Sequence, residues 1–587
     1  NREIAPIEAW AEQKDVLVVD PDASTVLEDW SRVGRRQSDS RTLRLVGALA
    51  PGSSLKQGDS AFVMYDDPPP VGCGSVPAGQ RGEHGGGTVL RVRALPDGRA
   101  AVDLEETAGR DDAGVACAPW PELPLALTPG PPINTRTQRE AILEWGEALV
   151  DRPDRRDATI DLLRREPPRL IGGGRLGPVD RPAADAVTAA ALRLDSSSLA
   201  VQGPPGSGKT HVGAQVVAAL VREHGWRVGV VAQSHAVVEN LLDRVLGAGV
   251  DPKQVGKRTS QGGRTGPWTP LDSRDVLDFV QQHRAEGFVL GGTAWTFSNP
   301  NQVPRHELDL LVVDEAGQFS LADTIAVGVS TRNLLLLGDP QQLPQVSQGL
   351  HPEPVDRSAL GWLADGHDVL PGELGYFLAE TWRMHPSLTD AVSGLSYEGR
   401  LGSRPETTTR RLAGVEPGLV AVPVEHEGDS VQSAAEADAV VELVRSHLGR
   451  RWTDPPADRL GEPLGQPDLI VVAPFNAQVA LIRERLDAAG FARVPVGTVD
   501  KFQGQEAVVA IVSLTSSSPA EVPRGISFVL SRNRINVAVS RAKWASYLVH
   551  SPALADHLPY TAEGLAELSG FLRLTGAERS LTALRTR

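Results

Sequence analysis

The chain has 587 residues, of which 41% are hydrophobic, and its 59 Lys and Arg against 74 Asp and Glu give a formal charge of −15. This composition is globular, the length exceeds one domain, and the acidic balance excludes nucleic-acid binding by overall attraction, so such a partner needs a local basic groove. The two cysteines exclude a disulfide scaffold and match no zinc spacing. No apolar run approaches the roughly 18 residues of a membrane helix. We therefore expect a soluble cytoplasmic protein with no membrane partner and no structural metal.

The N-terminal quarter of the chain differs from the rest in its pattern of apolar, polar and turn-forming residues. Residues 1–42 place tryptophans in polar surroundings, which predicts short stalk helices. Residues 43–129 contain short β-type runs separated by Gly, Pro and Asp clusters, which predict a small β-barrel. Residues 130–170 include a run of helical spacing, so we expect a stalk helix and linker that lead away from the barrel.

From about residue 170 to 560, short apolar strands alternate with amphipathic helices. Strands of this kind are typical of parallel sheets that helices cover on both faces, so the fold class is α/β. The stretch is too long for one such domain. Gly and Pro residues near 347–370 indicate the break. We place one sheet domain at 171–347, with a polar insertion at about 251–288, a second at 348–560 and a helical tail at 561–587.

A strand, a glycine-rich loop and a helix follow one another at residues 198–223. The spacing is that of a phosphate loop, whose backbone N–H groups and helix N-terminus attract phosphate oxygens. We therefore predict that ATP binds here, that Lys209 reaches its β- and γ-phosphates and that Thr210 ligates Mg²⁺. The loop consists of Gly203, Pro204, Pro205, Gly206, Ser207, Gly208, Lys209 and Thr210.

A second apolar strand ends in Asp314 and Glu315. Parallel strands of a nucleotide-binding fold present their site at this end. We expect Asp314 to hold Mg²⁺ and Glu315 to orient or deprotonate the water that attacks the γ-phosphate.

A third strand runs into Gly338-Asp-Pro-Gln-Gln-Leu343, which resembles the Gly-Asp-x-x-Gln-Leu motif of superfamily 1 helicases. The resemblance implies that Gln342 senses the γ-phosphate and that Asp339 belongs to a network that couples the domains.

Three later segments also resemble motifs of these helicases, in the same order: residues 381–386, 497–506 and 534–543. The resemblance implies that Arg383 and Arg541 reach the γ-phosphate, where an arginine is worth about 10³–10⁵ in rate. It also implies that Trp382 stacks on adenine, with core packing as the alternative, that Glu506 lies near the ribose and that Thr498 contacts the nucleic-acid backbone.

The same resemblance implies further contacts to nucleic acid. Polar side chains in these motifs suit phosphate contacts that position a strand without reading its sequence. Phe475 either stacks on a base or packs in the core, and both interpretations stay open. The implied contact residues are Gln233, Ser234, His235, Thr293, Pro474, Phe475 and Asn476.

The motif set most resembles superfamily 1B helicases of the nonsense-mediated-decay and replication nuclease-helicase branch. This resemblance implies two tandem RecA-like P-loop NTPase domains, an accessory N-terminal β-barrel on a helical stalk, ATP and Mg²⁺ as cofactors and a single-stranded nucleic acid as partner. More narrowly, the chain resembles the helicase half of bacterial RecB-like nuclease–helicase fusions, so we expect a fused or associated nuclease upstream of Asn1. The Glu-x-Lys form of Glu12-Gln13-Lys14 lacks a partner strand, so we interpret it as accidental.

The resulting hypothesis is a 5′-to-3′ translocase and helicase that acts in DNA processing or repair. An ATP-gated clamp on nucleic acid, or an RNA helicase that remodels ribonucleoproteins, remains the alternative. A degenerate relic would have lost Lys209, Asp314, Glu315 or Arg541, and all are present. The adenine-reading Gln of the family is absent from residues 181–187, so we expect GTP to be hydrolysed within about tenfold of the ATP rate.

Overall fold

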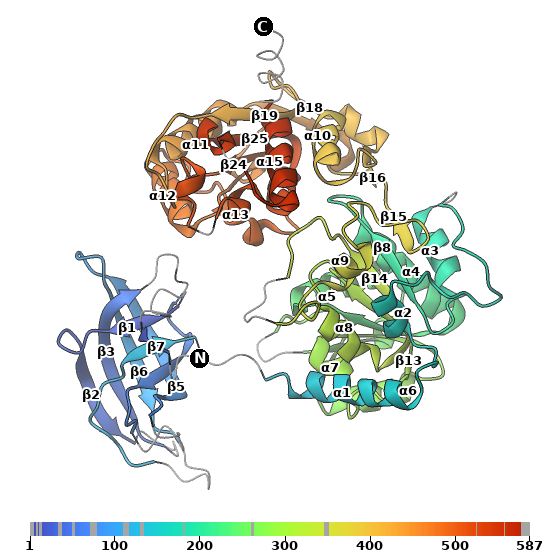
Figure 1. The fold of residues 1–587 in the computed structure, drawn as a ribbon, viewed down its shortest axis with the longest axis horizontal. Helices are drawn as coiled ribbons and strands as arrows, with labels where there is room; N and C mark the ends of the chain where they lie inside the picture. Colours follow the sequence, from blue (N-terminus) through green and yellow to red (C-terminus); the bar gives the residue numbers. More distant parts are fainter. Residues whose placement is uncertain are drawn as a thin grey trace. The chain divides into compact units, whose positions relative to one another are not determined.

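The computed structural model describes residues 5–576 except 8–9, 11–14, 33–37, 50–52, 54, 71–78, 110–116, 130–133, 180–181, 260–262, 346–350, 524 and 557. Residues Glu12-Gln13-Lys14 and Arg181 lie outside the described residues. The chain divides into two compact units, Asn1–Ile133 and Asn134–Arg587 (Figure 1). Among the described residues, no helix combines the length and apolar character that crossing a membrane requires.

The first unit is a small antiparallel β-barrel (Figure 1). Six strands form a ring in the order β1-β7-β4-β5-β6-β3, which closes because β1 also pairs with β3. Alternate side chains such as Leu43, Leu45, Val102 and Leu104 fill its interior. The predicted barrel is therefore confirmed. Its strands are β1 (Leu17–Val19), β2 (Thr25–Ser31), β3 (Ser40–Leu49), β4 (Ser60–Tyr65), β5 (Gly82–Ala94), β6 (Ala100–Thr107) and β7 (Ala126–Thr128).

The predicted stalk helices of residues 1–42 are wrong for the described part of this segment, which supplies β1, β2 and the start of β3. The β2 strand pairs with β3 outside the ring, and nearly all of its side chains are exposed. A strand without a buried face has no apolar alternation, so its sequence carries no β signal. The barrel accordingly begins at Leu17 instead of residue 43.

The second unit opens with an eight-stranded sheet in the order β11-β10-β12-β9-β13-β14-β8-β15, in which every pairing is parallel. We call this sheet and its helices the first sheet body. One face packs against α3, α4 and α5, and the other packs against α2 and α6 to α9. The strands are β8 (Ser198–Gln202), β9 (Arg227–Val231), β10 (Val255–Arg258), β11 (Thr269–Leu271), β12 (Phe288–Gly292), β13 (Leu308–Asp314), β14 (Thr331–Gly338) and β15 (Gly375–Phe377).

The helices of the first sheet body include α1, which runs along α8 through a cluster of Ala141, Ala326 and Val329. The stalk helix predicted within 130–170 thus packs on the sheet body. The helices are α1 (Arg136–Asp151), α2 (Ala158–Arg164), α3 (Ala183–Ala191), α4 (Lys209–His224), α5 (His235–Gly247), α6 (Asp275–His283), α7 (Ala294–Ser298), α8 (Leu321–Gly328) and α9 (Ala359–Ala364).

Two predicted boundaries of the first sheet domain are wrong. The segment 251–288 is no separate insertion, because β10 pairs with β12, and β11 extends the same sheet. Its strands are short, and the Gly and Pro residues between them hide the pattern. The body also continues past residue 347, because β15 pairs with β8 and Leu360, Leu370 and Leu374 lie in its core.

The remaining chain forms the second sheet body, a five-stranded parallel sheet in the order β19-β25-β24-β22-β23. Helices α10, α13, α14 and α15 cover one face, and α11 and α12 cover the other. Its strands are β19 (Gly418–Pro423), β22 (Leu469–Val472), β23 (Val496–Gly497), β24 (Ala507–Ser513) and β25 (Ala542–His550). Its helices are α10 (Pro386–Ser396), α11 (Ala434–His447), α12 (Asn476–Ala488), α13 (Ile526–Leu530), α14 (Arg532–Val539) and α15 (Ala562–Thr575).

Smaller elements flank this sheet. A three-stranded side sheet contains β18 (Arg411–Leu412), β20 (Arg451–Asp454) and β21 (Arg459–Pro463), and β16 (Glu380–Thr381) pairs with β17 (Gly402–Ser403). The predicted C-terminal helical tail contains α15, whose Leu568 and Phe571 lie in the core of the second sheet body, while residues 577–587 lie outside the described residues.

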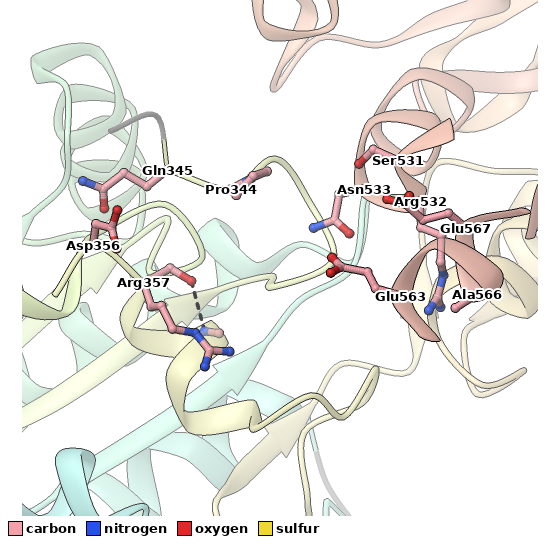
Figure 2. Close-up of a pocket in the computed structure, with 12 residues that line it drawn as sticks. Pro344, Gln345, Asp356, Arg357, Ser531, Arg532, Asn533, Glu563, Ala566 and Glu567 are labelled. Atoms are coloured by element: carbon pink, nitrogen blue, oxygen red, sulfur yellow. Dashed lines mark hydrogen bonds between the residues drawn. The ribbon is translucent and has the colours of Figure 1, made fainter. Parts of the chain in front are cut away.

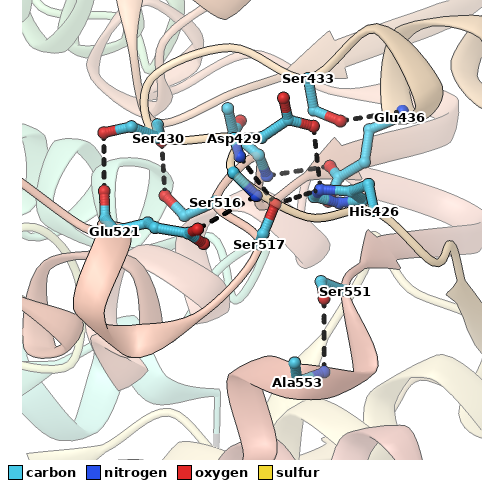
Figure 3. Close-up of polar contacts among 12 residues, drawn as sticks. His426, Asp429, Ser430, Ser433, Glu436, Ser516, Ser517, Glu521, Ser551 and Ala553 are labelled. Carbon is cyan, nitrogen blue, oxygen red and sulfur yellow. Dashed lines mark hydrogen bonds and ion pairs between the residues drawn. The ribbon is translucent and has the colours of Figure 1, made fainter.

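A buried polar cluster ties the loops that follow β19 and β24 (Figure 3). His426 lies 3.2 Å from Glu436 through Nε2 and 3.0 Å from Asp429 through Nδ1. Glu436 also accepts hydrogen bonds from the Ser513 hydroxyl at 2.6 Å and the Thr515 backbone N–H at 2.9 Å. The hydrogen bond to Glu436 raises the pKa of His426, so the protonated imidazole stabilises this cluster.

Candidate nucleotide site and nucleic-acid contacts

The predicted phosphate loop lies between β8 and α4, at the carboxyl edge of the first sheet. Gly206 and Gly208 have φ of +74° and +82°, a region that suits glycine. A Cβ added to Gly206 would lie 2.5 Å from both the Thr381 Oγ1 and the Arg383 Cβ, so another segment approaches the loop too closely for any side chain. The Ser207 hydroxyl is buried and has no hydrogen-bond partner among the described residues. The unpartnered Ser207 hydroxyl and the N-terminus of α4 directly after the loop are features of a phosphate cradle.

The predicted carboxylates lie beside this loop. Lys209 forms an ion pair with Glu315 at 3.0 Å. Glu315 is the residue directly after Asp314, which ends β13. These residues meet because β13, β14 and β8 are neighbouring parallel strands whose carboxyl ends share one edge. Although burial lowers it, the charges of Glu315 and Asp314 raise the pKa of Lys209, so its ammonium stays charged.

The Asp314 carboxylate is 1% exposed and accepts a hydrogen bond from the Glu315 backbone N–H at 3.0 Å. Burial and then the charge of Glu315 raise its pKa above the ordinary value. A buried carboxylate of this kind is stabilised by a cation, and carboxylate and hydroxyl oxygens are ligands that Mg²⁺ prefers. Asp314 and Thr210 therefore fit the predicted Mg²⁺ site.

A buried network surrounds Asp339, at the end of β14. The Asp339 carboxylate accepts hydrogen bonds from the Gln342 side chain at 3.0 Å and from the Tyr397 hydroxyl at 2.7 Å. Asn536 of α14 donates to the Tyr397 hydroxyl at 2.8 Å and to the Gln341 carbonyl at 2.8 Å. The network therefore joins the first sheet body to the second through Asp339.

Residues 381–383 lie against the phosphate loop. The Thr381 hydroxyl donates to the Pro205 carbonyl at 2.9 Å, and the Trp382 backbone N–H donates to the Gly206 carbonyl at 2.9 Å. Trp382 is 50% exposed, and the guanidinium of Arg404 lies 4.4 Å from the centre of its ring. The alternative that Trp382 packs in the core is therefore wrong.

Both predicted arginines are held by the second sheet body. Arg383 forms an ion pair with Glu506 at 3.0 Å and donates to the Ser540 carbonyl at 3.1 Å. Arg541 is buried and donates to the Val537 carbonyl at 2.8 Å. Burial and then repulsion from Arg383 lower the pKa of Arg541 to about 9, while the charge of Glu315 opposes this change. The two guanidinium groups and Glu315 thus lie in one electrostatic environment.

Glu506 was expected near the ribose, and its carboxylate lies between two cations. It is 3.0 Å from Arg383 and 3.0 Å from Lys543. Lys543 in turn lies 3.5 Å from Asp454, which is also paired with Arg410 at 2.8 Å. This set of charges therefore fixes the Arg383 guanidinium on the second sheet body, while the Arg383 backbone lies against the phosphate loop.

Sequence reasoning missed Arg410 and Asp454. The buried Arg410 side chain donates to the Trp382 carbonyl at 3.2 Å and to the Arg383 carbonyl. Asp454, at the end of β20, fixes the Arg410 guanidinium in this orientation. No spacing marks these residues, since they lie between motifs and act through backbone groups.

The predicted nucleic-acid contacts of the first sheet body cluster at neighbouring strand ends. Gln233 follows β9 and donates to the Gln318 carbonyl, and Ser234 caps α5 by accepting from the Val237 backbone N–H at 3.3 Å. His235 Nδ1 lies 2.8 Å from Lys257 Nζ. Thr293 follows β12, which pairs with β9, and its side chain makes no capping hydrogen bond at α7.

The predicted contacts of the second sheet body follow two neighbouring strands of its sheet, β22 and β23. Pro474, Phe475 and Asn476 follow β22, and Thr498 follows β23, which pairs with β22. Phe475 is 9% exposed and packs at 5.5 Å between ring centres on Phe528. The structure thus favours the core-packing interpretation of Phe475 over a base-stacking role.

A cavity of about 520 Å³ lies between the two sheet bodies (Figure 2). Asp356 and Arg357 line one side, and Arg532, Glu563 and Glu567 line the other. Its lining mixes both signs of charge and includes no residue of the phosphate loop. This cavity is therefore separate from the nucleotide site.

Two family models, each described as an AAA domain, match this chain, one over residues 184–353 and the other over 367–552. The chain is 22% identical to the DNA replication ATP-dependent helicase/nuclease JHS1 of Arabidopsis thaliana, over 64% of this chain and 29% of that protein. It is 24% identical to the DNA polymerase alpha-associated DNA helicase A of Schizosaccharomyces pombe, over 60% of this chain and 62% of that protein.

The chain is also 24% identical to the regulator of nonsense transcripts 1 homolog of Drosophila melanogaster, over 68% of this chain and 36% of that protein. It spans less than two thirds of the length of each of these relatives. Both AAA-domain matches fall within residues 184–552, and two of these three relatives are named as helicases.

Proposed function

We propose that the protein is an ATP-dependent translocase and helicase that moves 5′ to 3′ on single-stranded nucleic acid, with its two sheet bodies acting as tandem RecA-like domains. One observation carries this proposal. The segment that carries Arg383, which is bonded to the second sheet body, lies against the phosphate loop, where Lys209 is paired with Glu315 at 3.0 Å.

The residues of the phosphate loop bind the ATP phosphates through backbone N–H groups. Lys209 then exchanges Glu315 for the β- and γ-phosphates, which frees the Glu315 carboxylate to orient the attacking water and accept its proton. Thr210 and Asp314 would hold Mg²⁺, which would supply positive charge to neutralise the phosphates. Arg541 and Arg383 stabilise the charge of the transferring phosphoryl group.

Hydrolysis in this scheme depends on the second sheet body, because both arginines are bonded to it. ATP favours the arrangement in which the arginines reach the γ-phosphate, and phosphate release removes that preference. The predicted nucleic-acid contacts lie at strand ends of both bodies, and the two bodies bind the strand tightly in turn. The contacts include Gln233 and Thr293 in the first body and Pro474 and Thr498 in the second. Repeated cycles therefore move the protein along the strand.

We further propose DNA as the strand, a fused or associated nuclease as partner and the cytoplasm as the location. The name of one relative, a DNA replication helicase/nuclease, supports the first two. The absence of a Gln in residues 181–187 supports hydrolysis of other nucleoside triphosphates besides ATP.

The test is ATP hydrolysis measured with single-stranded DNA, with single-stranded RNA and with neither. Glu315→Gln should abolish the stimulated rate, and Glu442→Gln, which changes an exposed glutamate on α11, should leave it unchanged. Strand displacement from duplexes with a 5′ or a 3′ tail then separates a helicase from an ATP-gated clamp. Hydrolysis that neither polymer stimulates would contradict the proposal.

A further inference from the structure

A buried lysine lies beneath one of the predicted nucleic-acid contacts. The chain has seven lysines, and Lys257, in β10, has a side chain that is only 1% exposed. Lysine is rarely buried without a specific partner, because removing its charge from water is costly. The proposed ATP chemistry does not use Lys257, so its burial requires another explanation.

The surroundings of Lys257 match the three donors of an ammonium group. Its Nζ lies 2.8 Å from His235 Nδ1, 2.8 Å from the Arg258 carbonyl and 3.5 Å from Glu239 Oε1. An ammonium has three N–H groups and no acceptor. His235 Nδ1 is therefore the acceptor of this hydrogen bond, and the proton of the neutral imidazole lies on Nε2.

The charges around His235 favour this neutral form. Burial, Lys257 and Arg258 all lower the pKa of His235, while Glu239 raises it. Glu239 belongs to α5, like His235, and β12, which also packs against α5, carries no ionisable side chain. Besides β10, the other elements that pack against α5 are α4 and β9, and none of their ionisable side chains contributes to the lowered pKa of His235. These side chains are Lys209, His211, Arg222, Glu223, His224 and Arg227. The imidazole therefore stays neutral near pH 7, with one fixed donor.

His235 is placed to offer that donor to a phosphate. It is the first residue of α5, beside the exposed Ser234, and it follows the strand next to the one that precedes Thr293. Its Nε2 has no hydrogen-bond partner within the part of the chain that the structure describes. The positive end of the helix dipole also favours an anion at this position.

We propose that Lys257 is a positioning residue that presents His235 as a neutral Nε2–H donor to a phosphate oxygen of the bound strand. This inference rests on the proposed function. It differs from an ordinary basic contact, because a neutral donor displaces no counterion and adds nothing to the salt dependence of binding. It also explains why a histidine with an adjacent buried lysine occupies the first turn of α5.

The test is the affinity of the whole chain for a fluorescent oligo-dT, measured by anisotropy from pH 5.5 to 8. His235→Ala should weaken binding at pH 7.5 by about threefold to tenfold, the range expected for one hydrogen bond. Lys257→Met should weaken it similarly at pH 7.5 but restore it as the pH falls toward 6, because loss of the Lys257 charge raises the pKa of His235. The double variant should lack this pH dependence.

Lys253→Met is the matched control, because it removes the same charge from an exposed lysine that lies four residues before Lys257. It should leave the pH profile unchanged. Thermal unfolding of each variant separates a loss of folding from a loss of contact, and His235→Ala decides the question if Lys257→Met does not fold.

Two results overturn the inference alone: oligo-dT binding by His235→Ala at the native affinity, or a Lys257→Met profile that parallels the native one. Failure of the native chain to bind either oligo-dT or an RNA oligomer would instead overturn the proposed function.

Discussion

Glu506 either competes with the γ-phosphate for Arg383 or binds the ribose, and substitution of Glu506 should change nucleotide affinity in opposite directions in the two cases. In the structure, Glu506 holds Arg383 at 3.0 Å and Lys543 at 3.0 Å. If Arg383 must leave Glu506 to reach a γ-phosphate, then Glu506→Gln removes a competitor and strengthens ATP binding. If Glu506 instead bonds the ribose, the same substitution weakens the binding of every nucleotide.

The expected magnitude follows from exposure. The Glu506 side chain is 46% exposed, so the ion pair contributes about 0.5–1 kcal/mol, as for other partly solvated pairs. Because 1.4 kcal/mol corresponds to a tenfold change, Glu506→Gln should lower the Kd of a non-hydrolysable ATP analogue about twofold to fivefold. ADP lacks the γ-phosphate, so its Kd should stay within about twofold of the native value.

Isothermal titration calorimetry of both nucleotides with the native chain, Glu506→Gln and the control Glu442→Gln measures these changes. Weaker binding of both the analogue and ADP by Glu506→Gln would refute the reasoning and favour the ribose contact. An equal gain for both nucleotides would show a general charge effect and no competition for Arg383.

Three further outcomes are expected. Glu315→Gln should lower kcat by about 10²–10⁴ while ATP still binds, whereas Lys209→Ala should lose binding, and quenched-flow hydrolysis with parallel binding assays checks this difference. GTP should be hydrolysed within about tenfold of the ATP rate, and a larger preference for ATP in competition assays would contradict relaxed base selectivity. The raised pKa of His426 contributes stability that is complete below about pH 6.5 and is lost as the pH rises through the folded-state pKa. Urea unfolding at pH 6 and pH 8 should therefore show a smaller pH difference for His426→Gln than for the native chain.

The sequence predicted that Lys209 and Glu315 lie close together, because the segments that contain them follow apolar strands. Parallel strands bring their carboxyl ends to one edge, so the phosphate loop and Glu315 meet although about 100 residues separate them. The alternation of apolar strands with helices, which can be read from the sequence, therefore predicts which residues lie at that edge.

The residues and strands that the sequence did not reveal depend on contacts that leave no periodic pattern in the sequence. Arg410 acts on backbone carbonyls and Asp454 acts on Arg410, so neither stands at a spacing that any element imposes. The exposed β2 lacks alternation, and β10 and β11 are too short to show it. Lys257 was overlooked because burial of a charged side chain becomes visible only when its three acceptors are assembled around it.

The pairing of β15 with β8 bears on how the chain is made and how it can be divided. Gly375 lies opposite Ala200 in that pairing, so the first sheet lacks its last strand until residue 377 has left the ribosome. Until then β8, the strand that leads into the phosphate loop, has an unpaired edge that can join a strand of another chain. A fragment that ends at residue 353, where the first AAA-domain match ends, keeps this edge permanently and should aggregate. A fragment that continues through Leu378 retains the complete sheet.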